Sequence, residues 1–177
     1  MIYAKKKKIQ ESLNIVNSVS YPAIICFGRR RSGKSFIIQE FLNTLKNPIV
    51  LCFSKTAELT GSYKTAIIYN EFSPVILDAF MKKESKFEKI VVFDDIIETD
   101  TKYIKQLNNL FTMGRHYKTT VILATQYPSL LNPTIRGNSD FMYVLSGDGY
   151  HLISEKKYMN QHMIHKRPDQ DIYFDLI

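Results

Sequence analysis

The stretch Gly28-Arg29-Arg30-Arg31-Ser32-Gly33-Lys34-Ser35 decides the fold of this chain. It matches G-x-x-x-x-G-K-[ST], the P-loop pattern, at every fixed position. An apolar run precedes it, and apolar side chains at helical spacing follow it. In that context backbone N–H groups and a helix N-terminus surround anionic phosphates. We predict that residues 28–35 bind a nucleoside triphosphate, that Lys34 reaches its β- and γ-phosphates, and that the Ser35 hydroxyl ligates Mg²⁺.

Short apolar runs alternate along the chain with segments of helical period, as in a parallel sheet covered on both faces. The apolar runs are continuous, which is typical of strands buried on both sides. Strands are expected at residues 23–27, 49–53, 90–93, 121–124 and 141–145, and a weaker edge strand at 66–69. Helices are expected at 34–45, where Phe36 joins an apolar stripe, and at 73–83 and 101–113. The predicted fold is α/β, a P-loop NTPase with a mostly parallel sheet of at least five strands and helices on both faces.

Two acids follow the apolar run at residues 90–93. Asp94 and Asp95 should therefore lie at the carboxyl end of a buried strand, the edge where ligands bind in open α/β sheets. We expect Asp94 to hold Mg²⁺ through its water shell and Asp95 to polarise the attacking water.

Two further polar residues flank the strand expected at 121–124. Gln126 follows it and is expected to sense the γ-phosphate or orient water. Arg115 lies on a loop after a glycine, and we expect it to stabilise transition-state charge in a neighbouring subunit's site. The alternative for Arg115 is a surface ion pair.

Four segments in order, GRRRSGKS, KIVVFDD, GRHYKTTVILATQ and TIRGNSDFMYVL, resemble the motifs of the viral DNA-packaging ATPases in the FtsK-HerA superfamily. The resemblance spans residues 23–145. It implies a RecA-like sheet of the ASCE type, with an extra strand between the P-loop and Walker B strands. It also implies an oligomeric ring that uses ATP and Mg²⁺ to pump double-stranded DNA into a capsid, with a capsid vertex protein as a further partner.

The resemblance carries over to individual residues. Lys34 and Ser35 match the Walker A motif, Asp94 and Asp95 match Walker B, and Gln126 matches the polar residue that ends the next strand. Arg115 matches the arginine before that strand, and Arg136 is the second candidate for an arginine finger. Many members of the superfamily carry glutamate where this chain has Asp95, so Glu98 is an alternative catalytic base.

The 177 residues carry a formal net charge of +7 at pH 7, which suits a phosphate-rich partner. Basic clusters at residues 5–8, 29–31, 82–83 and 165–167 supply this excess, unless they are only solvated surface. Tyr63, Tyr69 and Tyr127, near loops, are further candidates for DNA contact. Cys26 and Cys52 lack C-x-x-C spacing and are interpreted as core thiols.

No apolar stretch approaches the roughly 20 residues of a membrane span, and no signal peptide is evident. We expect the protein in the host cytoplasm or a viral factory, or associated with the virion, and not secreted. One domain is expected over residues 1–177, with a motif-bearing core at 21–147 and segments 1–20 and 148–177 of unassigned role.

Three other functions compete with a packaging motor. They are a small nucleoside or nucleotide kinase, a DNA-translocating ATPase that does not package, and a non-catalytic NTP-binding scaffold. Asp94, Asp95 and Gln126 suit water as the phosphoryl acceptor, and no arginine-rich lid segment is evident.

Overall fold

The computed structural model describes residues 2–96, 101–126, 132–146 and 149–153. The helices are α1 (Ile2–Asn17), α2 (Lys34–Thr44), α3 (Ala57–Thr60), α4 (Pro74–Lys82), α5 (Thr101–Met113), the 3₁₀ helix η1 (Gly114–Tyr117) and α6 (Pro133–Asn138). The strands are β1 (Ala23–Gly28), β2 (Ile49–Ser54), β3 (Ile67–Tyr69), β4 (Lys89–Asp94), β5 (Thr119–Thr125), β6 (Phe141–Ser146) and β7 (Gly149–Ile153). None of the described helices is both long and apolar enough for a membrane span.

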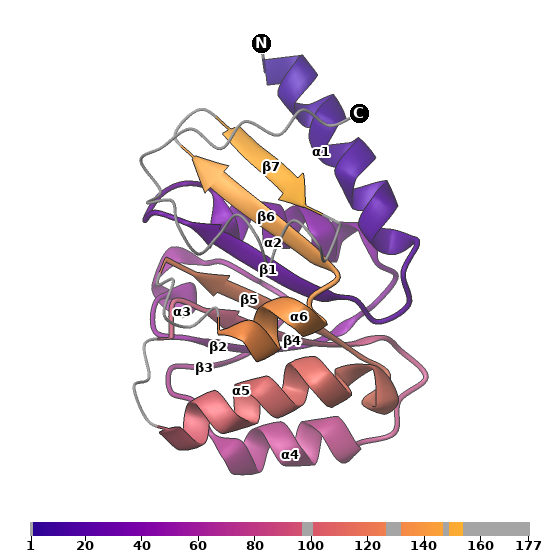
Figure 1. The fold of residues 1–177 in the computed structure, drawn as a ribbon, viewed down its shortest axis with the longest axis vertical. Coiled ribbons are helices and arrows are strands. Elements are labelled where there is room, and N and C mark those ends of the chain that lie inside the picture. Colours follow the sequence, from indigo (N-terminus) through magenta and orange to yellow (C-terminus); the bar gives the residue numbers. More distant parts are fainter. Residues whose placement is uncertain (1, 97–100, 127–131, 147–148, 154–177) are drawn as a thin grey trace.

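The strands form one sheet in the order β3-β2-β4-β5-β1-β6-β7 (Figure 1). All neighbouring pairs are parallel except β6 and β7, which are antiparallel. The expected α/β fold with a mostly parallel sheet is thus confirmed. Strand β5 lies between β1, which leads into the P-loop, and β4, which ends in Asp94. This is the extra strand that the resemblance implies.

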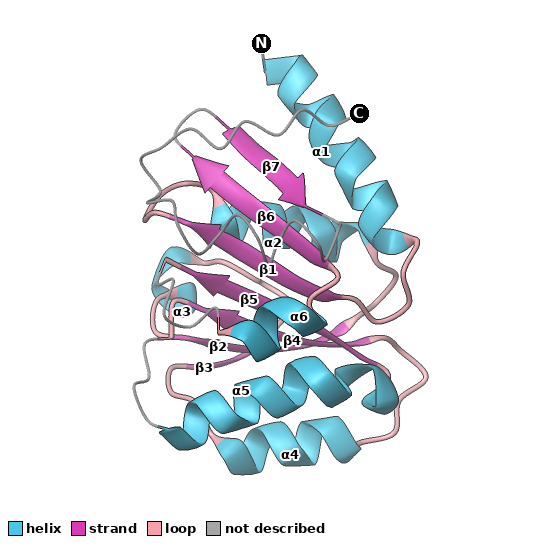
Figure 2. Ribbon diagram, viewed as in Figure 1, coloured by secondary structure: helices cyan, strands magenta, loops and turns pink. Residues whose placement is uncertain are grey.

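Helices cover both faces of the sheet (Figure 2). One apolar layer joins α4, α5 and α6 to alternate strand residues such as Ile25 and Phe93. The other joins α1, α2 and α3 to the intervening residues, which include Cys26 and Cys52. Both thiols are buried and free, as expected. Because β1, β2, β4, β5 and β6 are buried on both sides, each of them is a continuous apolar run in the sequence.

Several sequence-predicted boundaries follow from local chemistry that the structure shows directly. Ser73 caps α4, and its side chain accepts a hydrogen bond from the Ile76 N–H while Pro74 occupies the first turn. Gly114 is the first residue after α5. A Cβ on Gly114 would lie 2.9 Å from Val121 Cγ2, so the close packing against β5 favours glycine there. At the other end of α4, the buried Lys89 ammonium donates to the Met81 and Lys83 carbonyls, 2.6 and 2.9 Å away.

The structure also departs from the sequence-based expectations. Phe36 was expected on the buried stripe of α2, but its side chain is 50% exposed. Strand β7 and the short helices α3 and α6 were not predicted. Residues 66–69 do form an edge strand, β3, although it is only three residues long.

Candidate nucleotide-binding site

The P-loop connects β1 to α2 through a backbone that only particular residues allow. Gly33, the residue before α2, has φ 100°, in the left-handed region that favours glycine. The chain at Gly28 packs closely against Ser32 and Leu145. A Cβ on residue 28 would lie 2.6 Å from Ser32 Oγ and 2.7 Å from the Leu145 carbonyl oxygen, so only glycine fits there. The Arg29, Arg30 and Arg31 side chains are exposed, so the loop directs its backbone inward and its guanidinium groups outward.

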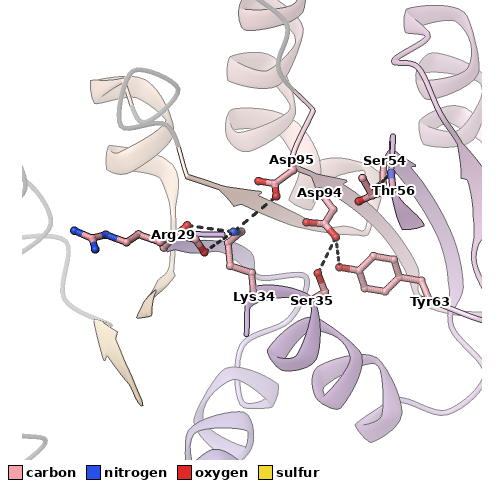
Figure 3. Close-up of polar contacts among 9 residues, drawn as sticks. Arg29, Lys34, Ser35, Ser54, Thr56, Tyr63, Asp94 and Asp95 are labelled. Carbon is pink, nitrogen blue, oxygen red and sulfur yellow. Dashed lines mark hydrogen bonds and ion pairs between the residues drawn. The ribbon is translucent and has the colours of Figure 1, made fainter. Parts of the chain in front are cut away.

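Lys34 lies within this loop and is only 5% exposed. Its ammonium donates to the Gly28 and Arg29 carbonyl oxygens, each 3.1 Å away. It also lies 3.8 Å from Asp95 Oδ2 (Figure 3). Among the described residues, the carboxylate that pairs with the buried Lys34 ammonium is that of Asp95, the predicted catalytic base.

Ser35 and Asp94 meet at the carboxyl end of β4. Ser35 Oγ donates to Asp94 Oδ2 at 3.0 Å, and Tyr63 OH donates to the same oxygen at 2.7 Å. The register β2-β4-β5 places Asp94 level with Ser54 and Ala124 at the sheet edge. The two residues predicted to hold Mg²⁺ are therefore in direct contact.

Asp95 turns the chain sharply away from β4. It has φ 52°, a left-handed conformation, and its N–H donates to the Ala124 carbonyl at 3.1 Å. Burial raises the pKa of its carboxyl above the ordinary aspartate value, and the charge of Asp94 raises it further, while Lys34 opposes the shift. A carboxylate with a raised pKa is a stronger proton acceptor.

The remaining predicted site residues do not lie together. Gln126 follows β5 at the same sheet edge as Asp94. Arg115 belongs to η1, just before β5 begins, and pairs with Asp140 at the start of β6. That edge is about 20 Å from the P-loop, at roughly 3.3 Å per residue along β1. Arg136 lies in α6, partly buried, and Glu98 falls outside the described residues.

The geometry of the site fits a triphosphate and a metal ion. Two buried oxygen atoms, Ser32 Oγ in the loop and Asp95 Oδ1 beside Lys34, have no hydrogen-bond partner in the described part of the chain. Buried polar atoms ordinarily have a hydrogen-bond partner, so these two oxygen atoms are suited to bind a polar ligand. The hydroxyl of Ser35 and the carboxylate of Asp94 are oxygen ligands of the kind that Mg²⁺ prefers.

Sequence reasoning missed one residue of this site, Tyr63. The expectation that it touches DNA is wrong, because its side chain is fully buried and its hydroxyl reaches Asp94. No spacing rule links position 63 to position 94. The two meet only because the segment after α3 folds back over the end of β4.

Comparison with known proteins supports the fold. No family model matches the chain. An uncharacterized protein of Frog virus 3 (isolate Goorha) is 28% identical over 68% of this chain, and the match spans 42% of that protein's length. Among solved structures, the DNA-packaging ATPase of Sulfolobus turreted icosahedral virus superposes with a TM-score of 0.50 at 15% identity, over 71% of this chain and 75% of that one. ATPases 2 and 3 of EssC from Geobacillus thermodenitrificans superpose with a TM-score of 0.55 at 16% identity, over 84% of this chain and 35% of that one. At these identities the likeness is one of fold: this chain shares the P-loop ATPase fold.

Proposed function

We propose that the protein is an Mg²⁺-dependent ATPase that works as an oligomeric ring and moves double-stranded DNA into a viral capsid. The observation that carries the ATPase part is the convergence of four side chains at one sheet edge: Lys34 and Ser35 from the P-loop, and Asp94 and Asp95 from the end of β4. Residues 94 and 34 are 60 positions apart, so the fold alone brings these groups together.

Each residue has a distinct task in this proposal. The loop N–H groups and the Lys34 ammonium bind the phosphates, and Ser35 and Asp94 would hold Mg²⁺. The ion, when bound, neutralises charge on the β- and γ-phosphates. Asp95 accepts a proton from the attacking water, and Gln126 orients that water or senses the γ-phosphate. Glu98 is the alternative base.

The fold likeness supports a motor over a kinase. The two compared structures are described as a DNA-packaging ATPase and as EssC ATPases, and the virus relative is consistent with a viral source. A nucleoside or nucleotide kinase remains the alternative of a different class, and a DNA translocase that does not package is the alternative of the same class. We place the activity in the host cytoplasm or viral factory, or at the virion, in a single domain.

Charge supports nucleic acid as the partner. The chain carries +7, and a groove of about 710 Å³ is lined by Lys82, Lys83, Lys86 and Lys118, with Glu84 and Glu88 beside them. Lys82 is partly neutralised by Asp78, 2.7 Å away, while Lys83 and Lys86 are exposed. The clusters at 5–8 and 165–167 lie outside the described side chains.

The mass of the particle in solution tests the ring. Wild-type protein is measured by light scattering with and without Mg²⁺, a non-hydrolysable ATP analogue and duplex DNA. We expect the mass, after that of the bound DNA is subtracted, to rise to a fixed multiple of 20.6 kDa when all are present. A monomer under every condition, with ATP turnover intact, would contradict the ring.

A further inference from the structure

Tyr63 lies in the segment between α3 and β3 and is held at both ends. Its side chain is fully buried, and its backbone N–H donates to Gln39 Oε1, 3.1 Å away on α2. Its hydroxyl donates to Asp94 Oδ2 at 2.7 Å (Figure 3). The backbone has φ 56°, a left-handed conformation that is unusual for a bulky residue. A tyrosine held in this conformation at a functional carboxylate points to a role beyond filling the core.

The two hydrogen bonds to Asp94 converge on one of its oxygens. Ser35 Oγ and Tyr63 OH both donate to Oδ2, at 3.0 and 2.7 Å. Among the described residues, no hydrogen bond to Oδ1 is found. The carboxylate plane is therefore fixed by two donors on one side, and Oδ1 is left to accept from the water shell of a metal ion.

The chemistry of the phenol suits this task. It donates a hydrogen bond without adding a positive charge, so Asp94 keeps the negative charge that attracts a divalent cation. A tyrosine hydroxyl has an ordinary pKa of about 10, so it stays protonated and remains a donor throughout the physiological pH range.

We propose that Tyr63 is a positioning residue that orients the Asp94 carboxylate for Mg²⁺, acting through its hydroxyl and not by contact with the nucleotide. The proposal rests on the proposed function, since it assumes that Asp94 serves a metal–nucleotide complex. Partners of this kind, which orient a metal-binding group, typically contribute about 10- to 100-fold to metal affinity.

The test uses Tyr63→Phe in the full chain, which removes one oxygen and keeps the ring. Mn²⁺ replaces Mg²⁺ as a paramagnetic probe, and its binding is followed by electron paramagnetic resonance in the presence of a non-hydrolysable ATP analogue. We expect Mn²⁺ to bind about 10- to 100-fold more weakly than to wild type. Analogue binding without metal should be unchanged. In turnover assays the Mg²⁺ concentration at half-maximal rate should rise, while the rate at saturating Mg²⁺ changes little.

The matched control is Tyr143→Phe. Tyr143 is also a buried tyrosine, and its hydroxyl donates to Ser12 Oγ of α1, 3.2 Å away and outside the nucleotide site. The Tyr143→Phe protein should be less stable than wild type but should bind Mn²⁺ with the same affinity. Equal Mn²⁺ affinity in Tyr63→Phe and wild type would overturn the proposal and leave the ATPase proposal standing. Failure of wild type itself to bind Mn²⁺ with the analogue would overturn the proposed function instead.

A second variant keeps the test decisive if Tyr63→Phe does not fold. Gln39→Leu removes the acceptor of the Tyr63 N–H and leaves the phenol in place. We expect a smaller loss of Mn²⁺ affinity in the same direction. An unchanged affinity in folded Gln39→Leu protein would then count against the positioning role.

Discussion

Ser35 donates a hydrogen bond to Asp94 across 59 positions of sequence, with Oγ and Oδ2 3.0 Å apart. Ser35 is the second residue of α2, and Asp94 is the last residue of β4. The contact joins α2, which follows β1 and the P-loop, to β4. In the sheet, β5 separates β4 from β1. The two residues that we propose to hold Mg²⁺ are thus brought together by the fold without any ligand.

The close packing of Gly28 gives the first prediction. In Gly28→Ala the new Cβ would meet Ser32 Oγ at 2.6 Å and the Leu145 carbonyl at 2.7 Å, so the P-loop must shift. We expect loss of ATP binding, measured by calorimetry, and a destabilisation of about 1–3 kcal/mol. The control is Gly137→Ala in α6, where nothing lies within 4 Å of the new Cβ. That variant should bind ATP normally, and normal binding by Gly28→Ala as well would contradict the loop geometry.

Asp95→Asn tests the catalytic base. The variant keeps Ser35 and Asp94, so it should bind Mg²⁺-ATP normally, but it should hydrolyse ATP about 10² to 10⁴ times more slowly because the amide cannot accept the proton. Single-turnover hydrolysis measures the chemical step directly. A near-normal rate would transfer the role to Glu98.

The same variant has a predicted effect on stability. Burial raises the folded-state pKa of Asp95 above its ordinary value of 3.8, so its ionised form is less favourable in the folded protein than in the unfolded chain. Its stabilising contribution is present below the unfolded pKa and is lost as the pH rises through the folded pKa. Asp95→Asn should therefore have a larger free energy of unfolding than wild type at pH 7 in urea titrations. The difference should shrink as the pH falls toward 3.8.

Arg115 is the third test, because its position limits what it can do. It lies at the sheet edge opposite its own P-loop, about half exposed at 53%, and pairs with Asp140. Asp140 Oδ2 also accepts the Ala23 N–H at 2.8 Å. A finger role therefore requires a neighbouring subunit. We expect Arg115→Ala to bind ATP normally and to lose about 10³- to 10⁵-fold in turnover, whereas Asp140→Asn, which breaks the same ion pair, should retain activity.

Mixing variants tests whether the finger acts between subunits. Lys34→Ala and Arg115→Ala proteins, each inactive alone, should regain turnover when mixed, because mixed rings contain interfaces with an intact P-loop and an intact arginine. Complementation by Arg136→Ala in place of Arg115→Ala would assign the finger to Arg136. Equal loss of activity in Arg115→Ala and Asp140→Asn would indicate a structural ion pair.

Most of the fold can be predicted from this sequence because its strands are buried on both faces. Continuous apolar runs identify β1, β2, β4, β5 and β6, and the Ser-Pro start of α4 and the glycine after α5 mark helix boundaries. Strand β7 could not be predicted, because among the described strands it pairs only with β6 and its sequence has no apolar run.

The residues of the candidate site likewise differ in how far the sequence predicts them. Lys34, Ser35, Asp94 and Asp95 each carry a local signal, namely a glycine-rich loop or acids after a buried strand. Tyr63 carries none, because its role depends on a contact 31 positions away. Phe36 fits the apolar pattern of α2 and is nevertheless exposed, since a helical pattern gives the spacing of a stripe but not its edges.

The basic groove gives a prediction for DNA binding. Affinity for duplex DNA should be independent of sequence and should fall linearly with salt in a log-log plot, through counterion release. Substituting both Lys83 and Lys86 by alanine should reduce that slope by about 2, at roughly 0.9 per phosphate contact. The control substitutes Lys46 and Lys55, which are exposed elsewhere. A flat salt dependence in wild type would argue against DNA, and an unchanged slope in the double variant would exclude this groove.

The most direct measurement of the central claim is steady-state ATP hydrolysis by wild-type and Lys34→Ala protein, each with duplex DNA, with nucleosides, and alone. Lys34 lies inside the P-loop and pairs with Asp95, so its loss should abolish turnover while the circular dichroism spectrum stays unchanged. Lys46→Ala, at an exposed position two residues after α2, should behave as wild type. The account predicts that duplex DNA of any sequence accelerates wild-type hydrolysis and that nucleosides do not. Undiminished turnover by Lys34→Ala, or phosphorylated nucleoside as the product, would contradict it.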